Sequence, residues 1–508
     1  MQCLFRMKGM IFMRKSGILL PVTSLHSQYG VGCFSKSAYD FVDWLKAAGQ
    51  SFWQILPLGP TGYGDSPYQS FSTFAGNPYM ISLKELIREG LLTKEECDGT
   101  LFSKEDNYVD YKLLYENRYP LLKKAFERSN HIENSAYKDF VKENNYWLRD
   151  YSLFMALKSE FGQRPWNEWA DDVRFRDKDA LKKYKEKIKK EIEFQSFIQF
   201  KFYSQWSALK TYANRKGISI IGDIPIYVSF DSADVWANPS LFQLDETLSP
   251  TFVAGCPPDG FSKTGQLWGN PLYHWENHRK TDYEWWKKRL SHALNLYDAL
   301  RIDHFRGFDK YYSIKYKSPD ATNGEWKDGP GAELFGAAKK ELGEKLIIAE
   351  DLGFITDSVK KLLSDCGFPG MKVLEFAFDS RDSGSSGEYL PHNYIKNCVA
   401  YTGTHDNQTL ISWLKTISEE EKKAVREYLC DAHTPDDELH IPLIASIMKS
   451  AAFLCIVPIQ DWLGLTDAAR INIPSTTEKN WQWRLTKRQL CGGVAKKIYS
   501  MTSIYGRL

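Results

Sequence analysis

The segment Leu296–Asp303, which reads LYDALRID, is a short apolar run that ends on a carboxylate. Its length and its apolar residues are typical of a buried strand. Similar runs recur along the chain, separated by segments long enough for helices: Phe52–Pro57, Ile218–Asp223, Lys345–Glu350, Lys372–Phe376, Cys398–Thr402 and Phe453–Pro458. This alternation predicts βα units around a parallel sheet, and 508 residues are sufficient for a barrel-sized domain with insertions.

A helix is predicted between Phe34 and Gly49, because the apolar residues at 38, 41, 42 and 45 follow helical spacing. Two longer segments interrupt the alternation. Residues about 66–200 are predicted as a mainly helical insertion and residues about 228–295 as a loop-rich one. Both are assigned to a single catalytic barrel of residues 14–508.

Residues 1–13 are interpreted as an N-terminal extension, because Met13 would serve equally well as a start. No small-residue cleavage site follows the short apolar stretch there, and no later run reaches transmembrane length. Neither secretion nor membrane insertion is therefore expected. The nine cysteines form no CxxC pair and no regular spacing, which is typical of reduced thiols in a cytoplasmic protein.

The charges nearly balance, since Lys and Arg number 66 and Asp and Glu number 64. No net field is available to gather nucleic acid or anionic lipid, so a neutral partner is expected. The lysine-rich run 181–190 does not alter this, because Leu181, Tyr184 and Ile188 form an apolar stripe typical of a helix with one solvated face. Aromatic residues make up 14% of the chain and suit sugar rings, although core packing accounts for most of them.

Acidic residues stand at or just after the ends of four predicted strands: Asp223, Asp303, Glu350 and Asp406. The carboxyl ends of barrel strands converge on one mouth, so these side chains are expected to share a site. A single acid at such a position is more often a helix cap or part of an ion pair. Four together favour catalysis, because clustered carboxylates repel one another.

Two carboxyl groups in different environments suit cleavage of a glycosidic bond with retention, which needs an ionised nucleophile and a protonated acid. Arg301 lies two residues before Asp303 and on the same strand face, where its guanidinium favours the ionised form of Asp303. Glu350 follows an apolar run, so burial and neighbouring carboxylates are expected to raise the pKa of its side chain. Asp303 is therefore predicted as nucleophile and Glu350 as acid and base. Asp406, beside His405, suits hydrogen bonds to a distorted sugar.

No metal and no organic cofactor is expected, because carboxylates can carry out all of this chemistry. The sequence contains no cluster of His and Cys residues with the spacing of metal ligands. His304 and His405 are interpreted as hydrogen-bonded histidines rather than as ligands.

Six motifs resemble those of the amylomaltase family, and they occur in the order found in that family. They are DSPYQ (65–69), GDIPIYV (222–228), KTGQLWGNP (263–271), RIDHFRG (301–307), AEDLG (349–353) and GTHDN (403–407). The resemblance extends from about Ser16 to Trp483. This family is a branch of the α-amylase superfamily, so the resemblance implies a (β/α)8 TIM barrel without a C-terminal β-sandwich.

The resemblance also implies an activity. It is that of a 4-α-glucanotransferase, which transfers segments of α-1,4-glucans such as starch or maltooligosaccharides to glucose or another glucan. The implied catalytic residues are Asp303 as nucleophile, Glu350 as acid and base, and Asp406 as stabiliser of the transition state. The implied substrate-binding residues are Asp223, Arg301 and His405 around the cleaved sugar, Tyr68 as a stacking platform, and Trp268 and Asn270 on a loop that covers the cleft.

Alternatives remain at this stage. An α-glucan hydrolase would use the same three carboxylates, and a covering aromatic loop favours transfer only weakly, by excluding water. A glucan-binding protein without activity would be expected to lack one of the three. For Tyr68 and Trp268, the alternative to substrate binding is plain packing within loops. Two positions depart from the family pattern, namely Cys256, where an aliphatic residue is usual, and Ser475, where glycine is usual.

Overall fold

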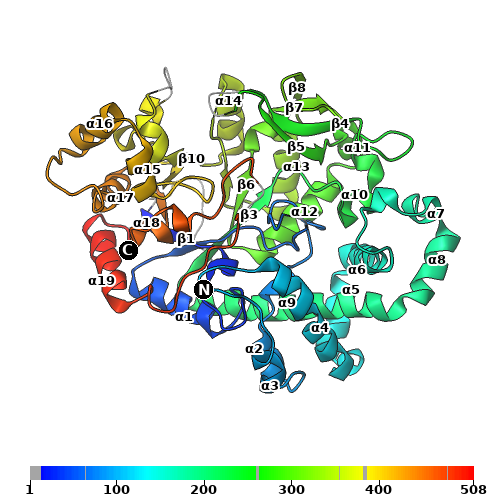
Figure 1. Ribbon diagram of the computed structural model, residues 1–508. Helices are drawn as coiled ribbons and strands as arrows, with labels where there is room; N and C mark the ends of the chain where they lie inside the picture. Colours follow the sequence, from blue (N-terminus) through cyan, green and yellow to red (C-terminus); the bar gives the residue numbers. More distant parts are fainter. Residues whose placement is uncertain (1–12, 63, 259–261, 354, 381–385, 477–478) are drawn as a thin grey trace.

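Eight parallel strands form the centre of the computed structural model, which describes residues 13–62, 64–258, 262–353, 355–380, 386–476 and 479–508 (Figure 1). The strands are β1 (Lys15–Leu19), β2 (Phe52–Gln54), β3 (Ser219–Pro225), β6 (Ala299–Asp303), β9 (Ile347–Ala349), β10 (Gly370–Val373), β11 (Cys398–Tyr401) and β12 (Leu454–Pro458). Their order is β10-β11-β12-β1-β2-β3-β6-β9. The N–H of Ala349 donates a 2.9 Å hydrogen bond to the carbonyl of Pro369, between β9 and β10, so the sheet is nearly closed into a barrel.

Helices alternate with the barrel strands. The first, α1 (Lys36–Ala47), confirms the helix predicted between Phe34 and Gly49, and its apolar residues at 38, 41, 42 and 45 are buried. The others in the barrel region are α9 (Lys189–Arg215), α12 (Glu284–Leu296), α13 (Ala332–Leu342), α14 (Asp357–Cys366), α15 (Leu410–Thr416), α16 (Glu419–Leu429), α17 (His440–Lys449), α18 (Ile459–Trp462) and α19 (Gly492–Ile504). Among the described residues after β12 there are helices and no β-sandwich. The (β/α)8 barrel predicted from the sequence is confirmed.

Each of the seven predicted apolar runs overlaps a barrel strand, although several boundaries differ, most of all in the run 372–376. The run 372–376 was expected as a strand, whereas β10 ends at Val373 and Leu374–Phe378 forms a 3-10 helix, η7. The strand β1 was not predicted, because only Ile18 and Leu19 within it are strongly apolar. Its small residues serve close packing, since a Cβ added at Gly17 would lie 2.5 Å from the carbonyl oxygen of Phe52.

The barrel interior has an apolar layer and a polar layer. The apolar layer consists of Leu19, Phe52, Ile221, Ala299, Ile348, Met371, Val373, Val399, Tyr401, Phe453, Leu454 and Ile456. Side chains alternate along a strand, so Ala299, Arg301 and Asp303 share the inner face of β6. The carboxyl end of β6 therefore carries charged groups directly above the apolar layer.

Between β2 and α9 the chain leaves the barrel and forms helices, which lie at the lower right in Figure 1. They are α2 (Leu83–Arg88), α3 (Lys94–Asp98), α4 (Tyr111–Arg128), α5 (Ser135–Glu143), α6 (Asn145–Glu160), α7 (Asp171–Arg174) and α8 (Lys178–Lys187). The lysine-rich run 181–190 belongs to two helices, because α8 ends at Lys187 and α9 begins at Lys189. Leu181 and Ile188 are buried while the lysines of the run are exposed.

A second sheet lies beside the barrel, at the upper right in Figure 1. Its antiparallel strands are β4 (Phe252–Cys256), β5 (Gln266–Pro271), β7 (Lys310–Lys315) and β8 (Gly324–Asp328), in the order β5-β4-β7-β8. The short helices α10 (Ala233–Ala237) and α11 (Trp275–Lys280) flank β4 and β5 in the sequence. The prediction of a loop-rich segment at about 228–295 did not include this sheet. β7 follows the barrel strand β6 through the 3-10 helix η6 (Phe305–Phe308), which keeps the sheet near the carboxyl end of β6.

In the part of the chain that the structure describes, no helix is long and apolar enough to cross a membrane. Residues 1–12 of the predicted N-terminal extension lie outside the described residues.

Ser475 adopts a left-handed backbone conformation, with φ at 64°, in an exposed turn closed by a hydrogen bond from Thr476 N–H to the Ile473 carbonyl. This conformation costs a side-chain-bearing residue about 1–2 kcal/mol, and glycine gives back about 0.5–1 kcal/mol in unfolded-state entropy. We expect Ser475→Gly to raise the free energy of unfolding by up to about 1 kcal/mol, measured by denaturant titration. Ser475→Ala is the matched control, and an equal gain in that variant would contradict the explanation.

Candidate active site

A buried arginine joins two of the four predicted carboxylates. The Nη1 of Arg301 donates to Oδ2 of Asp223 at 2.6 Å, and its Nη2 donates to Oδ1 of Asp303 at 2.8 Å. Arg301 is 3% exposed and Asp223 is 1% exposed, whereas about a third of the Asp303 side chain is accessible. Charge-assisted hydrogen bonds of this kind orient a carboxylate, so Asp303 is held at the end of β6 with part of its surface open to a reactant.

Glu350 follows β9 and lies beside the peptide that follows Asp303. Its Oε2 accepts a 2.7 Å hydrogen bond from the N–H of His304, and its Oε1 accepts one of 2.8 Å from the N–H of Leu352. Burial, and after it the negative charge of Asp303, raise the pKa of Glu350 to about 7. The carboxyl group can therefore hold a proton near neutral pH and release it again.

Asp406 lies on the loop after β11, and 44% of its side chain is exposed. Its Oδ1 accepts a 2.6 Å hydrogen bond from Nδ2 of Asn472 and lies 3.4 Å from Nε2 of His405. The other carboxylate oxygen is available to a ligand in this geometry, because these contacts all involve Oδ1.

Tyr68 connects the Asp406 loop with Asp223. Its hydroxyl donates a 2.8 Å hydrogen bond to Oδ2 of Asp223, and its ring stacks on His405 with a centroid separation of 5.1 Å and an angle of 13°. The structure therefore brings Tyr68, Asp223 and His405 together at the mouth of the barrel. One face of the Tyr68 ring is occupied by His405.

Trp268 and Asn270 reach the same region from strand β5, and not from a loop as the resemblance implied. The ring of Trp268 meets that of His304 edge-on at 4.7 Å, which brings β5 to the residue after Asp303. Asn270 is buried, donates from Nδ2 to the Val228 carbonyl at 2.8 Å and accepts from Nε2 of Gln69 at 3.2 Å. Both groups of its amide thus contact the protein and tie β5 to the segment around Tyr68.

Oδ1 of Asp223 and Nε2 of His304 are buried polar atoms without a hydrogen-bond partner among the described residues. Burial lowers the pKa of His304 to about 4, so its imidazole is neutral at neutral pH. Unpaired polar atoms are rare inside proteins, and here they lie next to accessible carboxylates, where ligand hydroxyls could satisfy them.

Several residues that complete the site were not predicted. Arg470 donates from Nη2 to the Asp406 carbonyl at 2.6 Å, beside the Asn472 contact already described. The ring of Trp481 lies 5.9 Å from that of Tyr68 and 5.8 Å from that of His405. These residues follow β12 and lie outside the six motifs. Nothing local in the sequence indicated that they return to the barrel mouth.

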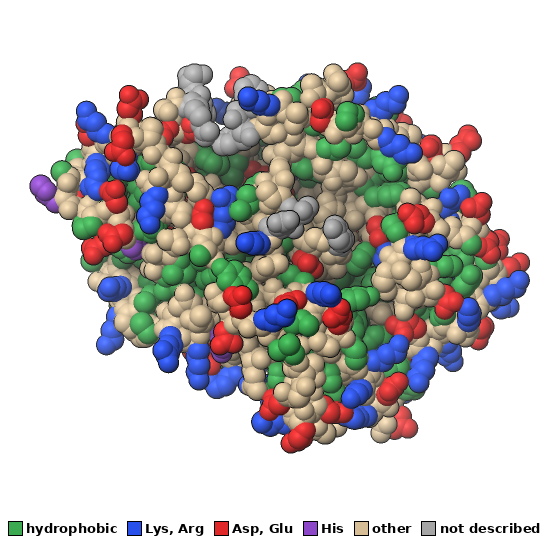
Figure 2. Space-filling view, in the orientation of Figure 1, with side chains coloured by type: hydrophobic (Ala, Val, Ile, Leu, Met, Phe, Trp, Pro, Cys, Tyr) green, Lys and Arg blue, Asp and Glu red, His purple; other side chains and the backbone are tan. Residues whose placement is uncertain are grey.

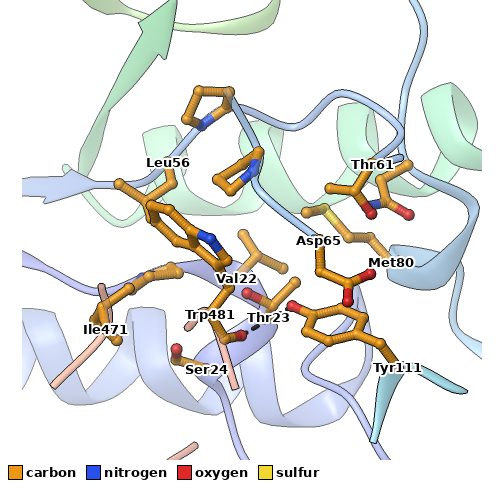
Figure 3. A pocket seen from close by; sticks show the side chains of 14 residues that line it. Val22, Thr23, Ser24, Leu56, Thr61, Asp65, Met80, Tyr111, Ile471 and Trp481 are labelled. Atoms are coloured by element: carbon orange, nitrogen blue, oxygen red, sulfur yellow. Dashed lines mark hydrogen bonds between the residues drawn. The ribbon is translucent and has the colours of Figure 1, made fainter. Parts of the chain in front are cut away.

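A pocket adjoins the site on the side of Pro67 and Trp481 (Figure 3). Figure 3 shows the carboxyl of Asp65 beside the ring of Tyr111, whose hydroxyl donates a 2.8 Å hydrogen bond to the Trp481 carbonyl. Burial raises the pKa of Asp65 to about 6. The residues that line this pocket include none of the predicted catalytic carboxylates.

Within the described ranges, no three His, Cys, Asp or Glu residues are arranged to hold a metal ion. The expectation of no metal site overlooked one HxxxH pair in the sequence, His274 and His278, at the start of α11. Nε2 of His278 lies 3.2 Å from the Leu241 carbonyl, and burial lowers the pKa of His278 to about 4.

On the face shown in Figure 2, basic and acidic side chains are mixed rather than gathered by sign.

Residues 20–489 match the family model of 4-alpha-glucanotransferase, glycoside hydrolase family 77. The 4-alpha-glucanotransferase of Clostridium butyricum is 48% identical over 96% of this chain and 100% of its own length, and that of Thermus thermophilus is 45% identical over 97% and 99%. The structure of the amylomaltase from Streptococcus agalactiae in complex with acarbose is 41% identical, covers 97% of this chain and 99% of its own, and superposes with a TM-score of 0.93. The chain therefore belongs to the 4-α-glucanotransferase family, glycoside hydrolase family 77.

Proposed function

We propose that this 4-α-glucanotransferase works by a retaining double displacement in which Asp303 is the nucleophile and Glu350 the acid and base. The observation that carries the proposal is the contrast between two neighbouring carboxyl groups. Asp303 is bonded to the Arg301 guanidinium, whereas burial raises the pKa of Glu350 to about 7. One group is suited to attack as an anion and the other to donate a proton.

In the first step, a carboxylate oxygen of Asp303 attacks the anomeric carbon while Glu350 protonates the departing glycosidic oxygen. The donor chain is thereby cleaved and a glycosyl ester forms on Asp303. In the second step, ionised Glu350 removes the proton from the 4-hydroxyl of an acceptor glucose or glucan, which displaces Asp303. Asp406 binds hydroxyls of the sugar more strongly as the ring flattens, and the unpaired atoms of Asp223 and His304 supply further contacts.

The substrates of this proposal are α-1,4-glucans and glucose. The balance between transfer and hydrolysis depends on whether a sugar hydroxyl or water reaches the glycosyl ester first. Trp268 supports transfer because its ring lies edge-on against His304, the residue after the nucleophile, where it can help to exclude water. A cytoplasmic location is also part of the proposal, because the cysteine spacing is not that of a secreted disulfide framework.

Maltotriose as the only substrate is expected to give glucose together with a ladder of longer maltooligosaccharides. The number of reducing ends should rise little, because each cleavage is followed by transfer to another chain. Chromatography of the products with a parallel reducing-end assay measures both quantities. Steady growth of reducing ends without longer products would identify a hydrolase instead.

The kcat/KM for maltotriose is expected to fall as the pH rises above about 7, because Glu350 must be protonated in the free enzyme and its pKa is raised to about 7. The fall in kcat/KM with pH should fit the loss of one proton, that of Glu350. An α-glucosyl fluoride needs little protonation of its leaving group, so its pH profile should lack this limb. A profile for maltotriose that stays flat to pH 9 would contradict the role of Glu350.

A further inference from the structure

A buried carboxyl group beneath the loop that carries Asp406 has no part in the steps above. Glu375 belongs to η7 and is 6% exposed. Its Oε2 accepts a 3.0 Å hydrogen bond from Nδ2 of Asn407, whereas its Oε1 is buried and has no partner within the described part of the chain. A buried carboxyl group is costly to keep in the interior when only one of its oxygens accepts a hydrogen bond. This cost points to a function for the hydrogen bond that Oε2 does accept.

Asn407 connects Glu375 with Asp406. Its Oδ1 accepts two hydrogen bonds of 2.9 Å, from the N–H and from the hydroxyl of Thr404. Oγ1 of Thr404 in turn accepts a 3.2 Å hydrogen bond from the N–H of Asp406. These contacts form a hydrogen-bond chain in which each donor lies on the side of Asp406 and each acceptor on the side of Glu375, so the hydrogen bonds polarise one another. Oε2 of Glu375 is the final acceptor.

The surroundings of Glu375 favour its neutral form. Burial, and after it the charge of Asp461, raise the pKa of Glu375 well above its ordinary value, while Asn407 and Arg470 oppose this shift and Asp467 adds to it. Asp461 is itself held at the same loop, accepting from the Thr402 hydroxyl at 2.6 Å and from the Leu410 N–H at 2.9 Å. A neutral acid that only accepts through one oxygen can be replaced by glutamine without loss of that acceptor.

We infer that Glu375 is a positioning residue for Asp406: as the final acceptor of this hydrogen-bond chain, it fixes the loop that presents Asp406 to the cleaved sugar. The inference rests on the proposed function, because it assigns Asp406 a role in the transition state. The side chain and carbonyl of Asp406 are held separately by Asn472 and Arg470, so loss of Glu375 should displace Asp406 rather than release it.

Glu375→Leu removes the acceptor and keeps a side chain of similar size. We expect kcat for maltotriose to fall by up to about 100-fold with little change in KM, because a misplaced stabiliser weakens the transition state more than the ground state. Glu375→Gln should retain most of the wild-type kcat. If Glu375→Leu does not fold, Asn407→Leu interrupts the same chain from its other side and should lower kcat similarly.

A double-mutant cycle separates positioning from general destabilisation. Glu375→Leu should cause no further loss of kcat in an Asp406→Asn background, because the group that it positions is already disabled. The control is Leu114→Ala, which creates a cavity at a buried position of helix α4. This variant should have a lower free energy of unfolding but an unchanged kcat at temperatures below unfolding.

The result that overturns the inference is a fully additive loss in the double variant, an unchanged kcat in Glu375→Leu, or a Glu375→Gln variant as impaired as Glu375→Leu. Failure of the proposed function would look different. In that case Asp406→Asn alone would keep its activity, whatever the substitutions at Glu375 do.

Discussion

Asp303→Asn is expected to lower kcat for glucan transfer by at least about 10⁴-fold while leaving glucan binding largely intact. Asparagine has nearly the volume of aspartate but no attacking charge, so no glycosyl ester can form. Arg301 keeps its hydrogen bond to Asp223 in the variant, which should preserve the surrounding geometry. Steady-state kinetics with maltotriose give kcat, and calorimetry with a maltooligosaccharide gives the dissociation constant.

The matched control for this substitution is Asp328→Asn on β8, where the carboxylate is 87% exposed. It makes the same chemical change at an exposed carboxylate that contacts none of the proposed catalytic residues, and it should leave kcat unchanged. Undiminished transfer by Asp303→Asn would refute the assignment of the nucleophile. A large loss of binding in that variant would instead indicate that the substitution disturbs the site as a whole.

Glu350→Gln is expected to lower kcat by about 10²–10⁴-fold for maltotriose, because glutamine cannot protonate the departing glycosidic oxygen. The first step with an α-glucosyl fluoride should persist, since fluoride leaves without a proton. The second step should be slow for every donor, because no base remains to activate the acceptor. A rapid-mixing assay that follows fluoride release should therefore show a burst and then a slow phase.

Glu388→Gln, at a half-exposed glutamate, is the control for that experiment and should behave as the wild type. Equal losses in the rate of the first step for maltotriose and for the fluoride donor, with no burst of fluoride release from Glu350→Gln, would contradict the role of Glu350 as acid. They would be expected if the substitution only displaced the backbone of His304 and Leu352, which the carboxyl group holds through hydrogen bonds.

The centre of the site could be predicted from the sequence because local rules determine it. Arg301 and Asp303 are two residues apart in a strand, so alternation alone placed both on the same face, and the structure shows the expected ion pair at 2.8 Å. The carboxyl ends of β3, β6, β9 and β11 meet at one mouth in any parallel barrel. The catalytic roles themselves remain predictions until the variants are measured.

The strand β1 and the residues around Asp406 could not be predicted, because their positions depend on contacts between segments that are distant in the sequence. β1 is identified by its neighbours β2 and β12 rather than by its own composition. The surroundings of Asp406 show the same limit. Its partner Asn472 lies 66 residues further along the chain, and Glu375, which bonds to the neighbouring Asn407, belongs to an apolar run first interpreted as part of a strand. Their positions follow from tertiary packing, which periodicity in the sequence does not describe.

The central claim is that the donor sugar becomes covalently attached to Asp303, and mass spectrometry tests it directly. Glu350→Gln would be treated with an α-glucosyl fluoride, quenched in acid and digested, and the peptide that carries the added glucose would be sequenced. The account predicts one added sugar on the peptide that contains Asp303, at the carboxyl group of that residue. A label on Asp223 or on Asp406 would contradict the assignment and the mechanism built on it.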